Sequence, residues 1–147
     1  MKRNTQLSDV LHLLVHMAQH AEPMTSEQMA ACLQSHPVVV RRLLARLRQA
    51  GLVDSSRGHG GGWQLARAPD AISLYDVYLA LGEPLLLGHG VRGPHPDCAI
   101  ERAVNDALDD GYRQAQAALA AQLQALTLRK LGQRVQRARK EETSHAA

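Results

Sequence analysis

Residues 37–66 read PVVVRRLLARLRQAGLVDSSRGHGGGWQLA, and this segment carries the strongest indication of the fold. Pro37 suits the first turn of a helix, and apolar side chains then recur at helical spacing up to Gly51, which is suited to end the helix. The apolar side chains are Val40, Leu43, Leu44 and Leu47. Two strand-like runs, 52–54 and 63–66, flank a turn-rich segment with four glycines. The stretch therefore predicts a helix followed by a β-hairpin.

Two further helices are predicted before this stretch. Residues 5–20 form an amphipathic pattern, and Thr25 with Gln28 has the spacing of a capping box that opens a helix over 26–33. A break at 35–37 separates the second helix from the third. The apolar stripe of the first helix consists of Leu7, Val10, Leu11, Leu14, Val15 and Ala18. Three short helices with such a break predict a helix-turn-helix, and the hairpin adds a wing.

The chain after the hairpin predicts more helix and a long loop. Ser73 opens a short helix, residues 82–97 are rich in Gly and Pro, and a long helix follows near 100–126. The stripe of this long helix consists of Ile100, Val104, Leu108, Tyr112, Ala115, Leu119, Leu123 and Leu126. Gly111 weakens the middle of the helix and is a candidate point for a kink or a close backbone crossing.

Length and composition limit the class of protein. The 147 residues suffice for one ordinary domain, and no apolar run approaches the roughly 20 residues of a membrane span. We therefore expect a cytoplasmic protein without a signal peptide or a membrane contact. Residues 1–67, 68–126 and 127–147 carry net charges of +4, −5 and +4. This pattern favours a polyanion-binding part joined to a part that does not touch the polyanion.

The predicted third helix has a basic face opposite its apolar stripe. At about 100° per residue, Val38, Arg42, Arg46 and their neighbours point away from the core, as a helix in a DNA major groove requires. In the hairpin, Arg57 and His59 are placed to contact the minor groove or its phosphates. The predicted DNA-binding residues are His36, Val38, Val39, Arg41, Arg42, Arg46, Arg57 and His59.

Five motifs of the chain resemble those of one family. They are AGLV (50–53), SRG (56–58), GGWQLA (61–66), AISLYDV (71–77) and LTLRKL (126–131). In this order, over about residues 5–132, they resemble the Rrf2 family of bacterial winged-helix transcription regulators. The resemblance implies a homodimer joined through the long helix, with two winged domains on a pseudo-palindromic operator in double-stranded DNA.

The expected fold is mainly α: a winged helix-turn-helix with a small β-hairpin wing and a long C-terminal dimerisation helix. We divide the chain into four parts along these lines. Residues 1–81 are the predicted DNA-binding domain, 82–99 an effector or sensor loop, 100–132 the dimerisation helix region, and 133–147 a basic flexible tail.

The sequence departs from the resembled family at the sensor. Members that hold an iron-sulfur cluster have three cysteines about six residues apart in the loop before the long helix. Here Cys98 is alone, because Arg92 and Val104 stand six residues to either side. We therefore expect no iron-sulfur cluster and no other cofactor. Cys98 becomes a candidate thiol sensor, with an idle or buried cysteine as the alternative.

Other candidate sites have simpler interpretations. His89, His95 and Cys98 form a weak metal-site hypothesis, because their spacing is irregular. Cys32 is interpreted as a small core residue. The histidines of the first helix, which are His12, His16 and His20, could share a metal ion, but we interpret them as a solvated polar face.

The function expected from these residues is sequence-specific regulation of transcription. We expect a repressor that responds to an oxidant or a small molecule, and no motif indicates catalysis. One alternative is a protein-interaction adaptor with a degenerate DNA-binding domain, which could dock a partner through the acidic middle and the apolar run 85–87. Another is a metal-responsive sensor acting through the His89, His95 and Cys98 loop.

Overall fold

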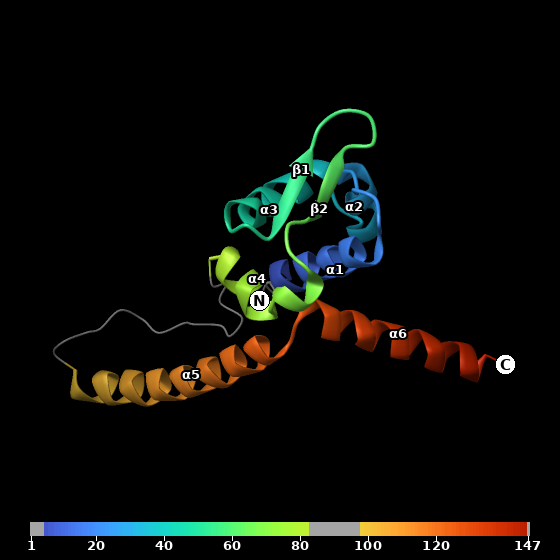
Figure 1. The fold of residues 1–147 in the computed structure, drawn as a ribbon. Helices are drawn as coiled ribbons and strands as arrows, with labels where there is room; N and C mark the ends of the chain where they lie inside the picture. The colour runs from blue at the N-terminus through green and yellow to red at the C-terminus, as the bar shows by residue number, and fades with distance from the viewer. Residues whose placement is uncertain (1–4, 83–97, 147) are drawn as a thin grey trace.

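The fold is a winged helix-turn-helix that continues into two long helices. The computed structural model describes residues 5–82 and 98–146. Its elements are α1 (Gln6–Gln19), α2 (Ser26–Leu33), α3 (Pro37–Gln49), β1 (Val53–Ser56), β2 (Gly62–Leu65), the 3-10 helix η1 (Pro69–Ala71), α4 (Leu74–Ala80), α5 (Ala99–Ala125) and α6 (Leu128–His145). Figure 1 shows the hairpin at one end of the winged domain, with α5 and α6 leading away from the other end in different directions. The predicted mainly helical fold is confirmed.

Two capping boxes start the short helices where the sequence indicates them. The Thr25 hydroxyl accepts from the Gln28 backbone N–H at 3.1 Å, and the Gln28 side chain accepts from the Thr25 N–H at 2.8 Å. Ser73 and Asp76 form the same pair of bonds at the start of α4, at 3.0 and 2.9 Å. Gln34 ends α2 in the left-handed conformation, with φ of 52°. The tight turn of the helix-turn-helix follows from this ending and from Pro37 at the start of α3.

The core lies between α1, α3, α4 and the hairpin. Val10, Leu14, Leu44 and Leu47 are fully buried there, as the predicted stripes require. Leu13 and Met17 of α1 are buried as well, although they lie outside the predicted stripe of that helix. Helix α1 buries more of its surface than the predicted stripe, because it packs against four elements: α2, α4, β2 and α6.

The hairpin is anchored to the connection between α1 and α2. Strands β1 and β2 pair antiparallel, and Trp63 on β2 also pairs with Met24 through two backbone hydrogen bonds of 2.8 and 2.9 Å. The Trp63 indole N–H donates to the hydroxyl of buried Ser26 at 3.1 Å. These contacts hold the base of the wing against the helix-turn-helix.

Gly62 lies where the hairpin closely approaches the connection between α1 and α2. Its φ is +155°, and a Cβ added there would lie 2.6 Å from the carbonyl oxygen of Met24. We expect Gly62→Ala to lower the free energy of unfolding by about 1–3 kcal/mol, because backbone has to move at both sites. Urea unfolding measures this loss. Gly132→Ala in α6, where a Cβ meets nothing within 4 Å, is the control and should not destabilise the protein. Equal midpoints for Gly62→Ala and the unaltered protein would contradict the close approach.

The two C-terminal helices are attached to the base of the winged domain. The Leu128 N–H donates to the Ile72 carbonyl at 3.0 Å, and the Leu74 N–H donates to the Leu126 carbonyl at 2.9 Å. Leu123 at the end of α5 and Leu128 at the start of α6 are both buried in the common core. The long helices are therefore packed into the same core as the helix-turn-helix.

Helix α6 includes most of residues 133–147, for which the sequence predicts a basic flexible tail. It is helical up to His145, and Thr127 caps it by accepting from the Lys130 N–H at 3.2 Å. Its Leu131 packs against the core, and Val135 lines a groove along α1. The apolar side of α6 therefore packs against α1. No helix in the part of the chain described is long and apolar enough to cross a membrane.

Candidate nucleic-acid interface

The outer face of α3 is open along its N-terminal half. Val38 and Val39 are 58% and 42% exposed, and Arg41 and Arg42 beside them are exposed as well. His36 precedes the helix but forms no side-chain cap, so the positive end of the helix dipole is left open. Exposed methyl groups, guanidinium groups and a free helix N-terminus are the chemistry with which proteins contact thymine methyls, guanine edges and phosphates.

The four arginines of α3 differ in the hydrogen bonds and ion pairs that their guanidinium groups form within the protein. Arg41 lies 3.5 Å from the Glu27 carboxylate, and Arg48 donates to the Ser55 hydroxyl at 3.0 Å. Arg46 donates to the Leu81 carbonyl at 2.9 Å. Arg42 has no hydrogen bond or ion pair with any residue of the described ranges 5–82 and 98–146. The Arg42 guanidinium can therefore turn toward a DNA base without breaking a contact of the kind that the other three arginines of α3 make.

Two arginines have structural contacts that the sequence pattern does not reveal. Arg46, predicted to face DNA, uses one nitrogen to bind the end of α4, which leaves only its remaining N–H groups for another partner. Arg67 donates to the carbonyls of Ala50 and Gly51 at 3.3 and 3.2 Å, where α3 ends. A basic residue next to a helix end in the sequence is readily predicted as a cap. Arg67 caps the end of α3 although the whole hairpin separates the two in the sequence.

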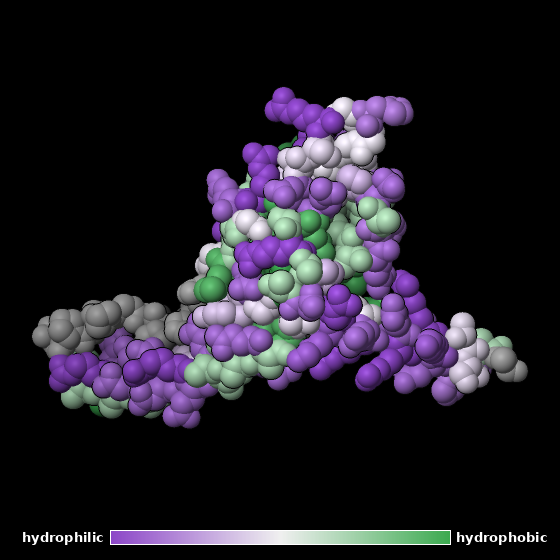
Figure 2. All heavy atoms as spheres, viewed as in Figure 1, coloured by the Kyte–Doolittle hydropathy of each residue, from purple (hydrophilic) through white to green (hydrophobic). Residues whose placement is uncertain are grey.

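The tip of the wing presents Arg57 and His59 to solvent. Gly58 and Gly60 have φ of +92° and +77°, so the turn uses conformations that other residues adopt with strain. Within the described parts of the chain, neither Arg57 nor His59 has a hydrogen-bond or ion-pair partner. Figure 2 shows hydrophilic side chains at the top of the molecule, where Figure 1 places the hairpin. The wing and α3 thus both offer free cationic or titratable groups.

This geometry agrees with the comparisons to known proteins. A family model described as "Rrf2: Iron-dependent Transcriptional regulator" matches residues 3–134. The chain belongs to the Rrf2 family. The HTH-type transcriptional regulator YwnA of Bacillus subtilis is 30% identical over 126 residues, which cover 86% of this chain and 93% of YwnA. The Rrf2 resemblance seen in the sequence is confirmed.

Two solved structures extend the likeness to three dimensions. The global cysteine regulator CymR of B. subtilis matches with a TM-score of 0.60 and 25% identity over 90% of this chain and 97% of CymR. IscR of T. potens matches with a TM-score of 0.68 and 24% identity, covering 94% of this chain and 90% of IscR. As a member of the Rrf2 family with this DNA-binding fold, the protein is a transcriptional regulator.

The donor groups of this Rrf2 protein do not fit a cluster held by three cysteines. The whole sequence has two cysteines, and both are exposed: Cys32 on α2 and Cys98 at the N-cap of α5. The interpretation of Cys32 as a core residue was wrong, because α2 buries Ser26, Met29 and Ala30 instead. Among the residues that the structure describes, no three His, Cys, Asp or Glu side chains gather as metal ligands. His89 and His95 lie outside the described residues.

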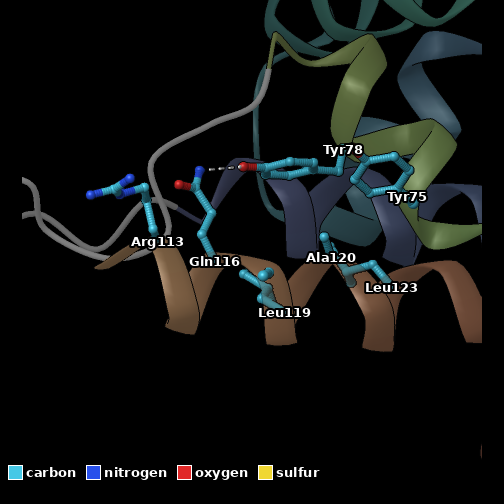
Figure 3. Close-up of a pocket in the computed structure, with 8 residues that line it drawn as sticks. Tyr75, Tyr78, Arg113, Gln116, Leu119, Ala120 and Leu123 are labelled. Atoms are coloured by element: carbon cyan, nitrogen blue, oxygen red, sulfur yellow. Dashed lines mark hydrogen bonds between the residues drawn. The ribbon is translucent and has the colours of Figure 1, made fainter. Parts of the chain in front are cut away.

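A pocket lies between α4 and α5 in this Rrf2 protein. Figure 3 shows Tyr75 and Tyr78 of α4 above Leu119, Ala120 and Leu123 of α5, with Gln116 and Arg113 further toward the N-terminal end of α5. The Gln116 amide N–H donates to the Tyr78 hydroxyl oxygen at 3.4 Å, and Arg113 pairs with Asp110 at 2.6 Å. The pocket combines aromatic walls with hydrogen-bonding groups, as sites for small molecules do. No local sequence pattern predicts this pocket, because its residues come from two segments that are far apart in the chain.

The histidines of α1 are only partly solvated. His12 and His20 are exposed, but His16 is half-buried in a groove that α1 forms with Leu131, Val135 and Arg139 of α6. Burial and the nearby His12, His20 and Arg139 lower the pKa of His16 below its usual value. The interpretation of a solvated polar face was therefore wrong for His16. Its position could not be foreseen, because no pattern within α1 shows which segment packs against His16.

Proposed function

We propose that this Rrf2 protein is a homodimeric repressor that binds a pseudo-palindromic operator. The observation that carries the proposal is the uncovered apolar side of α5. Ile100, Val104 and Leu108 are 78%, 51% and 48% exposed on the part of α5 that leads away from the winged domain in Figure 1. Leu123, at the other end of the same helix, is buried on its own domain. An apolar stripe that continues beyond its own domain fits a partner helix.

A second copy of this chain suits that surface. At about 100° per residue, Gly111, Ala115 and Ala118 continue the side of Ile100 and Leu108, and all three are exposed. Small side chains allow two helix backbones to approach closely, and a Cβ at Gly111 meets nothing within 4 Å in the described part of this chain. A two-fold axis through this contact would place two α3 helices on half-sites about one or two DNA turns apart.

The proposed repressor acts in the cytoplasm, performs no catalysis and responds to a signal. Two described features offer a place for a signal: the exposed thiol of Cys98 at the start of α5 and the Tyr75 and Tyr78 pocket at its other half. Cys98 precedes the first residue of α5, and α5 forms one wall of the pocket, so both features adjoin the helix that would join the two copies. An oxidant at Cys98, or a small molecule in the pocket, would therefore act on the spacing of the two DNA-binding domains.

Selection of bound duplexes from a random DNA library tests the proposed function. We expect a palindromic motif. Loss of enrichment after treatment with an oxidant would implicate Cys98, whereas an unchanged motif would direct the search for a signal to the pocket. Recovery of no motif, with only weak salt-sensitive binding, would contradict the proposal and favour a protein-interaction adaptor.

Arg57 should act on the operator as a phosphate contact. We expect Arg57→Ala to weaken binding to all sequences evenly and to lower the slope of log K against log salt by about 1 for each wing. Titration of binding against salt concentration measures the slope. The matched control is Arg137→Ala, which removes an exposed cation from α6 rather than from the wing. An unchanged slope for Arg57→Ala would remove the wing tip from the interface.

A further inference from the structure

His12 and His16 face each other on the outer side of α1. They are four residues apart, so they lie on the same side of the helix, one turn from one another. Their rings are stacked with centroids 4.8 Å apart, and their Nε2 atoms are 2.9 Å apart. In the metal-free protein one Nε2 donates to the other. Both nitrogens therefore lie together beside the groove between α1 and α6.

The distance between the two nitrogens is short enough for both to bind one metal ion. Imidazole bonds to divalent transition metals are about 2.0–2.1 Å long. Two such bonds at 90° put the nitrogens about 2.9 Å apart, whereas the tetrahedral angle requires about 3.3 Å. The observed 2.9 Å is the length of the hydrogen bond between the rings and lies close to both separations, so a small ring rotation suffices for either geometry. The affinity of an imidazole site for divalent first-row metals rises through Ni²⁺ to Cu²⁺.

We propose that the Nε2 atoms of His12 and His16 bind one Cu²⁺ or Ni²⁺ ion as a chelating pair. This site lies on a different helix from Cys98 and from the loop with His89 and His95, and it does not depend on DNA binding. The metal replaces the hydrogen bond between the two rings, with the other coordination positions open to solvent because His12 is exposed.

The surrounding groups set the limits of the site. His20 is one turn further along α1, and its Nδ1 donates to the His16 carbonyl at 2.8 Å. Its ring centroid is 6.3 Å from that of His16, too far for it to share the same stacked arrangement. The charged group that faces His16 from α6 is Arg139. Its guanidinium repels a cation, so we expect Arg139→Gln to tighten metal binding.

Calorimetric titration of the tag-free, full-length protein with NiCl₂ and with CuCl₂ tests the proposal. We expect one ion per chain, and a loss of affinity on the order of tenfold or more in His12→Gln, because one of the two linked ligands is removed. His20→Gln is the matched control and should bind as the unaltered protein does. The Cu²⁺ complex should show two equatorial nitrogens in its electron paramagnetic resonance spectrum.

The outcomes separate this site from other histidines. Equal affinity in His12→Gln and the unaltered protein would place the metal elsewhere and overturn the proposal. The proposal is also overturned if no ion binds, or if His20→Gln loses as much affinity as His12→Gln. Since His12 is exposed, its replacement should leave the thermal midpoint in metal-free buffer unchanged, which shows that the variant is folded.

Discussion

Leu108→Glu is expected to separate the proposed dimer into monomers. The side chain of Leu108 is 48% exposed in one chain, in the middle of the apolar side of α5. A partner helix would cover it, and by two-fold symmetry each dimer would bury two carboxylates without partners. We expect dimer affinity to fall by about a hundredfold or more. Sedimentation equilibrium at micromolar concentration would then report the mass of a single chain.

Leu79→Glu is the matched control for this experiment. Leu79 on α4 is 43% exposed, and the substitution adds the same charge at a leucine of similar exposure outside α5. It should leave the oligomeric state unchanged. If Leu108→Glu retained the mass of a dimer, this side of α5 would not be the contact. If the unaltered protein were already a monomer, the proposed homodimer itself would be wrong.

Arg42→Ala is expected to cost most of the specific affinity for the operator. Arg42 is the arginine of α3 without a partner in the part of the chain described. Its replacement therefore breaks no hydrogen bond or ion pair there, and the effect should fall on DNA binding. A bidentate contact to guanine contributes about 1–3 kcal/mol to discrimination at each half-site. A dimer would lose about 2–6 kcal/mol, which is a decrease of about thirtyfold at the least. Binding to the selected motif and to point-substituted duplexes measures both affinity and preference.

Arg41→Ala serves as the comparison on the same helix. Arg41 is exposed beside Arg42 but lies 3.5 Å from the Glu27 carboxylate, so part of its charge is already compensated. We expect a smaller loss of affinity that is similar for all sequences. Unchanged affinity and unchanged base preference in Arg42→Ala would show that the helix enters the groove with another face.

Much of the winged domain follows from local sequence patterns. The capping pair Thr25 and Gln28 starts α2, Pro37 starts α3, and the stripe from Val40 to Leu47 is buried as the period of the helix requires. Each of these signals depends on only a few neighbouring residues, so it predicts the local structure without knowledge of the tertiary contacts. The glycines of the wing belong to the same class, because their backbone conformation is a local requirement.

The remaining features depend on contacts between distant segments. Cys32 has the apolar neighbours of a core residue, but the orientation of α2 on α1 and α3 leaves it exposed. Arg46 lies on the predicted outer side of α3, yet α4 places the Leu81 carbonyl within its reach. Leu131 and Val135 of α6 lie in a groove along α1, and no pattern within α6 reveals which helix they face. Such contacts require the tertiary arrangement, which periodicity does not supply.

The pairing of the segment before α4 with the segment between α5 and α6 makes the molecule one folding unit. Ile72 and Leu74 obtain backbone partners only when Leu128 and Leu126 arrive from the far end of the chain. A fragment that ended after α4 would expose these groups together with the core that Leu123 and Leu128 cover. The DNA-binding domain is therefore not separable from its helices, and the intact chain should unfold in a single cooperative transition.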